Sequence, residues 1–260
     1  MLEEYKPLLP IFARVGGKTK LADKIISLFP PEKYIKTYVE CFVGGGSIFF
    51  RKKPAQINVI NDLDKDIYNI YNDIPKIKGN IDNFDFRGDE KLFEKLKKTN
   101  STNPEIRLYR NLYLSKNSYM GRRNTYGTDD RYKDETKKGS RMKNYFNDYK
   151  NKLSNTIILN KDYKDVIREF DSETTLFYLD PPYSQQEKSW GYNEGGTITP
   201  EELLKTLLNI KGFFVMSYDY SPENYKLFNK HFIVKILNTK YEMTKGSPKD
   251  MKEILVLNYK

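Results

Sequence analysis

Two consecutive prolines directly after an apolar run constrain this 260-residue chain more than any other feature. Residues 176–179, Leu-Phe-Tyr-Leu, are predicted to form a buried strand. Pro181 and Pro182 fix their own φ angles and lack N–H donors, so the strand must end in a rigid turn. The turn holds Asp180 and Tyr183 at the carboxyl end of the strand, which is the edge where open α/β sheets bind ligands.

This arrangement suits an amino group on a flat heteroaromatic base. Asp180 and the carbonyl of Pro181 can accept the two amine hydrogens while the ring of Tyr183 stacks on the base. Because the amine lone pair is delocalised, the two acceptors would draw the nitrogen toward tetrahedral geometry and free the lone pair for a methyl group. An ordinary Pro-Pro turn is the alternative for this motif taken alone.

Composition bears on the class of partner and the class of chemistry. The chain carries 45 Lys+Arg against 35 Asp+Glu, a formal charge of +10, which favours a polyanionic partner. The one cysteine, Cys41, is interpreted as a small buried residue, not as the thiolate that cytosine C5 methylation requires. His231 is the one histidine and lies far from any cluster of metal-ligand spacing, so we expect no metal.

Targeting signals are absent from the sequence as it stands. No apolar stretch approaches the roughly 18 residues of a membrane-spanning helix. The acidic first residues, 1–6, lack the apolar core of a signal peptide. We therefore expect a cytoplasmic protein, or one in the DNA-containing compartment of a host cell if it is viral, and no membrane partner.

Predicted strands and helices alternate along most of the chain. The expected strands are 37–43, 57–60, 156–159, 176–179, 212–217, 232–237 and 253–258. The expected helices are 20–29, one beginning at 47, then 64–72, 90–98, 105–114, 163–170, 200–209 and 222–229. The alternation predicts an α/β, Rossmann-like domain formed by residues 1–74 and 151–260. The polar residues 75–150 interrupt it as a mostly helical insertion.

Further segments are predicted to contribute to the same site. Residues 42–47, Phe-Val-Gly-Gly-Gly-Ser, turn a strand into a helix with little side chain in the way, and lack the Lys-Ser/Thr ending of a P-loop. Asp62 ends the next strand and can bond the ribose hydroxyls of a nucleoside, or else cap a helix. Residues 15–18 offer backbone approach and a cation, and residues 162–163 an acceptor and a ring for adenine. An ordinary loop and cap are the alternatives.

In their order along the chain, these motifs resemble the Dam-type, alpha-group (D12 class) DNA adenine N6-methyltransferases. The resemblance spans essentially the whole chain, from Gly16-Gly17-Lys18 to the closing strand at 253–259. It implies a methyltransferase sheet with an inserted target-recognition domain, S-adenosylmethionine as donor and S-adenosylhomocysteine as product. The acceptor would be the N6 amine of an adenine flipped out of double-stranded DNA. The target sequence, the oligomeric state and a cognate restriction endonuclease as partner are left open.

The site residues follow from the motifs and from this resemblance. The catalytic residues are expected to be Asp180, Pro181, Pro182 and Tyr183. The residues expected to bind S-adenosylmethionine are Arg14, Gly17, Lys18, Phe42, Gly44, Gly46, Asp62, Asp162, Tyr163 and Asp180.

A basic segment is predicted to bind DNA. Residues 116–150 hold ten Lys/Arg and five Asp/Glu, which is half of the chain's net charge. Arginine can pair with a guanine edge and asparagine with an adenine edge. The residues expected to contact DNA are Lys116, Asn117, Tyr119, Arg122, Arg123 and Asn124. The alternative is a solvated basic loop without base contacts.

Three rival functions remain at this point. Cytosine N4 methylation needs the same acceptor geometry, although that family more often has Ser where Asp180 stands. An RNA or protein methyltransferase is a second rival, with Asn usual at that position for protein glutamine methylation. The third, from a different class, is a catalytically silent DNA-binding module, which methyl incorporation into DNA would exclude.

Overall fold

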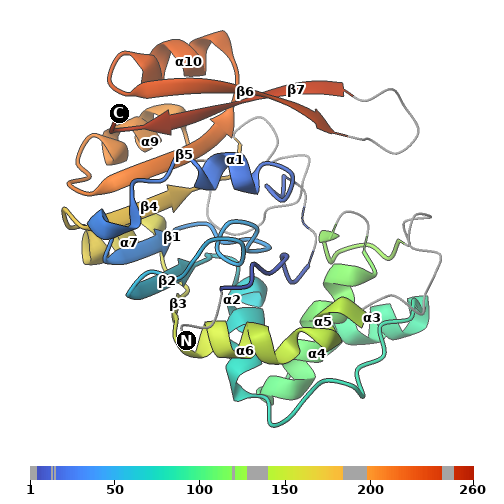
Figure 1. The fold of residues 1–260 in the computed structure, drawn as a ribbon. Coiled ribbons are helices and arrows are strands. Elements are labelled where there is room, and N and C mark those ends of the chain that lie inside the picture. The colour runs from blue at the N-terminus through green and yellow to red at the C-terminus, as the bar shows by residue number, and fades with distance from the viewer. Residues whose placement is uncertain are drawn as a thin grey trace. The chain divides into compact units, whose positions relative to one another are not determined.

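A seven-stranded sheet organises the computed structural model, which describes residues 5–12, 14, 16–118, 121–127, 140–183, 198–241 and 249–260. The strand order is β3-β2-β1-β4-β5-β7-β6 (Figure 1). The strands are β1 (Thr37–Glu40), β2 (Ile57–Asn61), β3 (Ile157–Leu159), β4 (Thr175–Leu179), β5 (Phe213–Asp219), β6 (Ile233–Tyr241) and β7 (Lys249–Leu257). Strands and helices alternate as the sequence predicts, which confirms the α/β, Rossmann-like class.

The central strands are parallel and in register. Glu40 of β1 lies opposite Ile60 of β2 on one side and Tyr178 of β4 on the other, and β4 pairs in parallel with β5. β7 is inserted antiparallel between β5 and β6. All five residues of β4 are buried, as an apolar run covered on both faces must be. The carboxyl ends of β1, β2, β4 and β5 therefore meet at one edge of the sheet.

The chain divides into two compact units. The first unit comprises Met1–Asp23, Val43–Lys53 and Asp62–Asn160, and the second comprises Lys24–Phe42, Pro54–Asn61 and Lys161–Lys260. The short helix α1 (Ala22–Ile26) begins in the first unit and ends in the second. The insertion predicted at residues 75–150 lies within the first unit, and its boundaries stay a prediction.

Helices dominate the first unit. They are α2 (Lys65–Asp73), the 3-10 turn η2 (Ile74–Lys76), α3 (Glu90–Lys98), α4 (Pro104–Lys116), α5 (Ser140–Asn144) and α6 (Phe146–Ser154). Helix α4 packs against both α2 and α3 (Figure 1). A bidentate ion pair fastens α2 to α4, because Nε and Nη2 of Arg107 donate to the fully buried carboxylate of Asp73 at 2.7 and 2.6 Å.

The helices of the second unit begin at side-chain caps. They are α7 (Tyr163–Phe170), α9 (Pro200–Leu207) and α10 (Pro222–Asn229), with the 3-10 turn η1 (Glu32–Tyr34) before β1. Asp162, Thr199 and Ser221 accept backbone N–H bonds at the three N-termini, which satisfies donors that no helical carbonyl reaches. In the described part of the chain, no helix combines the length and the apolar character needed to cross a membrane.

Two of the predicted helices are shorter or less regular in the structure. The helix expected from Ser47 is a run of turns, with the N–H of Phe50 bonded to Gly46 and that of Lys52 to Ile48. It ends within one more residue because Pro54 disfavours helical geometry at the residue before it. The helix expected at 20–29 is α1 alone, since three-residue turns replace helical bonds from Leu28 onward.

Candidate active site

Asp62 and the glycine loop are joined by hydrogen bonds within the first unit. The N–H of Gly44 donates to Oδ2 of Asp62 at 2.9 Å, and the N–H of Asp64 donates to Oδ1 at 3.0 Å. The cap of α2 is Asp64, whose Oδ1 accepts from the N–H groups of Asp66 and Ile67. The helix cap considered as an alternative role for Asp62 is therefore taken by its neighbour.

The glycine loop owes its shape to close packing. Gly44 and Gly46 have φ angles of 50° and 76°, which residues with side chains rarely adopt. A Cβ on Gly46 would lie 2.6 Å from Cδ2 of Phe50, and one on Gly45 would lie 2.7 Å from the carbonyl oxygen of Phe12. The hydroxyl of Tyr71 donates to the carbonyl of Gly44 at 2.6 Å. The loop is thus held in one conformation by its own surroundings.

The N-terminal loop lies against the glycine loop. Lys18 is buried, with Nζ donating to the carbonyl of Gly16 at 2.9 Å, and the N–H of Gly17 donates to the carbonyl of Arg14 at 3.0 Å. The hydroxyls of Thr19 and Ser47 are 3.1 Å apart. The first unit therefore brings together Arg14, Gly17, Lys18, Gly44, Gly46 and Asp62 of the predicted donor site.

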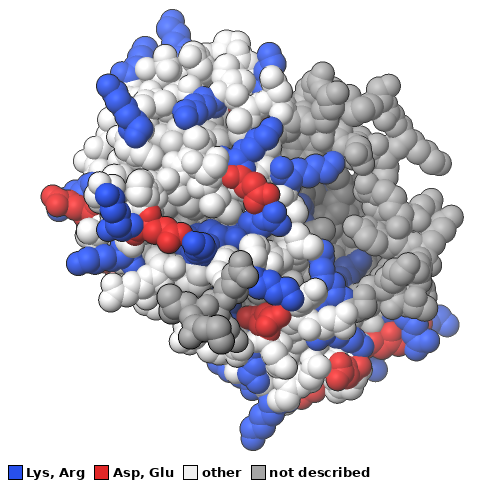
Figure 2. Space-filling model, in the orientation of Figure 1, with Lys and Arg blue, Asp and Glu red and all other residues white. Residues whose placement is uncertain are grey.

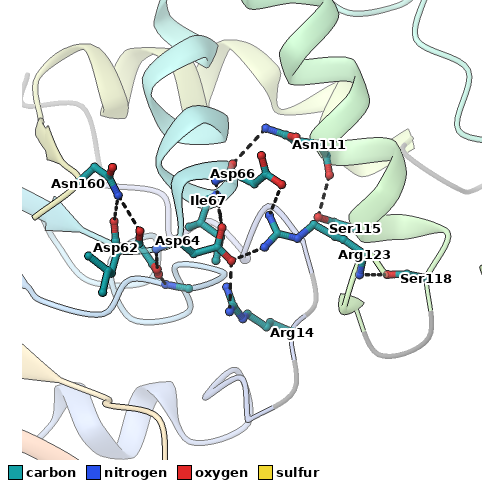
Figure 3. Close-up of polar contacts among 12 residues, drawn as sticks. Arg14, Asp62, Asp64, Asp66, Ile67, Asn111, Ser115, Ser118, Arg123 and Asn160 are labelled. Atoms are coloured by element: carbon teal, nitrogen blue, oxygen red, sulfur yellow. Dashed lines mark hydrogen bonds and ion pairs between the residues drawn. The ribbon is translucent and has the colours of Figure 1, made fainter. Parts of the chain in front are cut away.

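Acidic and basic side chains lie close to one another around Asp62 (Figure 3). Burial raises the pKa of Asp62, and Arg14 opposes that rise while Asp64 adds to it. Nη2 of Arg14 lies 3.6 Å from Oδ2 of Asp64, and Nη2 of Arg123 donates to the same oxygen. Two cations therefore converge on the carboxylate that follows Asp62 by two residues.

The predicted catalytic turn follows β4 in the second unit. Pro181 and Tyr183 are buried, while Asp180 and Pro182 are partly exposed. The ring of Tyr183 meets that of Tyr218 edge to face, with centroids 5.4 Å apart and planes at 74°. Tyr218, at the end of β5, in turn packs edge to face on Phe228 at 5.9 Å. The orientation of the Tyr183 ring is thus fixed by the adjacent strand.

A second aromatic pair lies in the second unit. The rings of Phe42 and Tyr163 have centroids 5.2 Å apart, and burial raises the pKa of the Tyr163 hydroxyl. Asp162 caps α7, since its Oδ1 accepts from the N–H of Lys164 at 2.8 Å. Asp162 therefore has the helix-capping role that was the alternative to binding adenine. Tyr163 lies next to Phe42.

Asn61 organises the edge of the sheet from which these segments leave, and sequence reasoning missed it. Its Nδ2 donates to the carbonyls of Cys41 and Lys161, both at 3.0 Å, and its Oδ1 accepts from the N–H of Lys161 at 2.9 Å. The N–H of Cys41 donates to the carbonyl of Tyr178 at 3.1 Å. An amide at the last position of a buried strand is the signal that could have revealed it. Cys41 itself is buried, as interpreted from the sequence.

The predicted DNA-binding residues have different surroundings, and Tyr119 lies outside the described residues. Asn117 is buried, and its Nδ2 donates to the carbonyls of Phe86 and Tyr113 at 3.3 and 3.2 Å. Nζ of Lys116 lies 5.3 Å above the Phe86 ring. Asn124 is exposed, whereas Arg122 and Arg123 are partly buried. A DNA contact by the side chain of Asn117 would require those two bonds to break.

Positive charge is spread widely over the described surface. On the face drawn in Figure 2, Lys and Arg side chains are more widespread than Asp and Glu side chains. Exposed lysines recur along α3, where Lys95, Lys97 and Lys98 lie in the last turn. This distribution agrees with the formal charge of +10 and suits a polyanionic ligand.

A parallel sheet whose strands lead into a glycine loop and an acidic residue is typical of α/β folds that bind nucleoside ligands at the carboxyl edge of the sheet. The model of the D12 class N6 adenine-specific DNA methyltransferases matches residues 15–244. The chain belongs to this family, which makes it an adenine-specific DNA methyltransferase and confirms the resemblance seen in the sequence.

Two Type II methyltransferases cover nearly the whole chain, and a third covers 70% of it. A Type II methyltransferase from Lactococcus lactis subsp. cremoris, M1.LlaDCHI, is 28% identical over 97% of this chain and 96% of its own length. M.MjaIII from Methanocaldococcus jannaschii, also a Type II methyltransferase, is 25% identical over 96% of this chain and 99% of its own. M.CviBI of Paramecium bursaria Chlorella virus NC1A is 26% identical over 70% and 72%.

A solved structure from Pyrococcus horikoshii, assigned to an RNA methyltransferase, also aligns with the chain. It covers 93% of this chain and 97% of its own, at 11% identity and a TM-score of 0.39. A superposition this loose gives no information about the site.

Proposed function

We propose that this methyltransferase transfers a methyl group from S-adenosylmethionine to the N6 amine of an adenine that is flipped out of duplex DNA. Family membership supports the reaction class, and one observation carries the site. The Asp-Pro-Pro-Tyr turn leaves the carboxyl edge of the sheet with the ring of Tyr183 held in a fixed orientation by Tyr218. A fixed ring beside a carboxylate is what positioning a flat amino base requires.

Residues of the first unit suit the ribose and methionine parts of the donor. Asp62 has both carboxylate oxygens oriented by backbone N–H groups, and each oxygen retains a lone pair for a ribose hydroxyl. Gly44 and Gly46 present backbone without side chains, and the buried Lys18 supplies a cation for a carboxylate. In the second unit, Phe42 and Tyr163 would contact the adenine. When bound, S-adenosylmethionine supplies an electrophilic methyl group on a sulfonium.

The chain's own residues would act on the target amine. Asp180 and the carbonyl of Pro181 accept its two hydrogens, and Tyr183 stacks on the base. A raised pKa is not required of Asp180, because the proton leaves only after the nitrogen has become quaternary and acidic. Positioning dominates such a reaction, where well-oriented reactants gain roughly 7–11 kcal/mol. Flipping is needed because a stacked base cannot reach the donor, and it costs a few kcal/mol.

DNA reading is assigned to the inserted segment, residues 75–150. Arg122 and Asn124 carry side chains that match guanine and adenine edges in the major groove. Lys116 is proposed to contact a DNA phosphate. Such a contact makes the affinity for DNA depend on the salt concentration. A cognate restriction endonuclease is proposed as a functional partner, since the relatives are Type II methyltransferases.

Donor-dependent transfer tests this function. Unmethylated duplex DNA is incubated with the protein and S-adenosylmethionine, and the nucleosides are then identified by mass spectrometry. N6-methyladenine is expected, and it should be absent when the donor is left out. N4-methylcytosine as the sole product would contradict the proposed substrate, and no methylated nucleoside would contradict the activity.

A further inference from the structure

The carboxylate of Asp64 forms ion pairs with two arginines that are far apart in sequence (Figure 3). Nη2 of Arg14 lies 3.6 Å from its Oδ2, and Nη2 of Arg123 donates to the same oxygen. The side chains of Arg14, Arg123 and Asp64 are 17%, 15% and 24% exposed. Ion pairs this sheltered are screened much less by salt than pairs at the open surface.

The backbone at Arg123 is held in an unusual conformation. Its φ angle is 61°, and it is the one described residue other than glycine with a positive φ. Its N–H donates to Oγ of Ser118 at 2.8 Å, and its Nη1 lies 3.6 Å from Oδ2 of Asp66. A strained backbone of this kind persists only where its surroundings hold it. The contacts with Asp64, Asp66 and Ser118 are those surroundings.

The pair is connected to the predicted ribose carboxylate. Asp64 donates its N–H to Oδ1 of Asp62 at 3.0 Å, and Asp62 accepts from Gly44 through its other oxygen. Burial by itself would raise the pKa of Asp64, but Arg123 and Arg14 outweigh it and the pKa is lowered. The lowered pKa favours the ionised form of Asp64, which the two ion pairs require.

We propose that Arg123 is a positioning residue that couples DNA binding to donor binding through Asp64 and Asp62. Its guanidinium ties residues 121–127, in the segment proposed to read DNA, to Asp64, whose N–H orients Asp62. A ligand on either side then changes the affinity for the other by the same factor. The inference rests on the proposed function for the identity of the two ligands.

The competing role for Arg123 is a direct contact with a base or a phosphate. That role would require its guanidinium to leave two carboxylates, Asp64 and Asp66, that it already contacts. Direct readout by Arg123 would therefore break both of these contacts.

Two substitutions remove the link while leaving the local backbone intact. Asp64→Asn loses the negative charge but keeps an oxygen to cap α2, since Asn caps helices about as well as Asp. Arg123→Asn loses the guanidinium, and Asn tolerates a positive φ better than most residues with a side chain. Arg51→Asn is the control, because it removes an equal charge from a pair with the exposed Asp23 in the same unit, outside residues 75–150.

The measurement is the affinity for S-adenosylhomocysteine, which binds without reacting, by calorimetry with and without a saturating unmethylated duplex. In the wild type and in Arg51→Asn, DNA is expected to change this affinity by about 5–150-fold, a typical range for coupled sites. In Asp64→Asn and Arg123→Asn, the ratio of the affinities with and without DNA should fall toward one. The double variant should lose no more than either single variant, because both act through one pair.

Several results would overturn the coupling. The coupling is wrong if DNA has no effect on the affinity for S-adenosylhomocysteine in the wild type, or if its effect is unchanged in both variants. It is also wrong if Arg123→Asn methylates a different sequence, because Arg123 would then read a base. Thermal melting checks that each variant is folded, and Arg123→Lys, which keeps a charge, should restore part of the factor. If the wild type methylates DNA but the substitutions leave the effect of DNA on S-adenosylhomocysteine affinity unchanged, only this inference fails. If it binds no donor, the proposed function fails with it.

Discussion

The N–H of Gly44 and Oδ2 of Asp62 are 2.9 Å apart, which ties the glycine loop to the residue that follows β2. The two residues are 18 positions apart in sequence, and each comes shortly after one of two neighbouring parallel strands. Because parallel strands end at the same edge, the strand ends bring loop and carboxylate together. The strand ends therefore bring together two parts of the proposed donor site.

Replacing Asp62 with Ala should weaken donor binding. The change removes both proposed ribose bonds and the acceptor for Gly44, and a lost buried partner costs about 1–3 kcal/mol. Calorimetric titration with S-adenosylhomocysteine measures the effect. Asp165→Ala, which removes an exposed carboxylate on α7, is the control and should bind as the wild type does. Equal affinity in the two variants would show that Asp62 does not hold the ribose.

Donor affinity should depend on pH through Asp62. Burial raises the pKa of this carboxyl, so it takes up a proton at a higher pH than an ordinary aspartate. The ionised form is the better acceptor for ribose hydroxyls, and affinity should therefore fall as pH decreases through the raised pKa. Titrations across mildly acidic pH measure this, and Asp62→Asn should be flat there. A wild-type affinity that is constant down to the ordinary range of aspartate would contradict the assignment.

Asp180→Ala should affect the chemical step more than binding. The carboxylate is proposed to accept a hydrogen of the reacting amine, so the single-turnover rate should fall by orders of magnitude. Gel-shift affinity for duplex DNA should change only a few-fold. Asp171→Ala serves as the control, because its carboxylate accepts from backbone N–H groups at Lys211 and Gly212 before β5. A rate within a few-fold of wild type would mean that another group holds the amine.

Arg122→Ala and Asn124→Ala should each relax the recognition sequence at one position. A base contact of this kind discriminates by about 1–3 kcal/mol, whereas loss of a phosphate contact weakens binding to all sequences alike. Sequencing the N6-methyladenine in the DNA of an expressing host gives the sites for each variant. If both variants keep the wild-type sites and the wild-type DNA affinity, these residues belong to a solvated loop.

Arg107→Ala should be among the most destabilising single changes in the first unit. It leaves the carboxylate of Asp73 buried without its cation, which costs about 3–5 kcal/mol for a buried pair. Arg51→Ala breaks a pair of similar geometry, with an exposed carboxylate on Asp23, and should cost about 0–1 kcal/mol. Urea denaturation compares the two. A smaller loss for Arg107 than for Arg51 would contradict the argument from burial.

The sequence predicted elements best where caps are readable. Helices α3, α7 and α10 have the predicted bounds, because each follows an Asp or Ser that caps its first turn. Helix α6 was missed. Its buried residues Phe146, Tyr149 and Leu153 have helical spacing, but Asn and Lys intervene and no side chain caps its N-terminus. Local signals of helix ends are therefore more informative here than apolar spacing.

The candidate site could be predicted only as far as its motifs. Asp62, the glycine loop and the Asp-Pro-Pro-Tyr turn are each a continuous segment that directly follows a predicted strand. Their position at the edge of the sheet was therefore predictable. The contacts of Arg14 and Arg123 with Asp64 were not, because they join residues separated by 50 and 59 positions. Pairing across such distances depends on the packing of the first unit and has no local signature in the sequence.

Gly46 has a consequence for how variation at this position should be interpreted. Its place is restricted twice, by a φ angle of 76° and by the ring of Phe50 at 2.6 Å from where a Cβ would stand. Both restrictions come from the protein's own packing and would persist in a chain that no longer bound any donor. Intolerance of substitution at Gly46 is therefore evidence about folding, and an inactive descendant of this enzyme would be expected to keep the glycine long after losing Asp180.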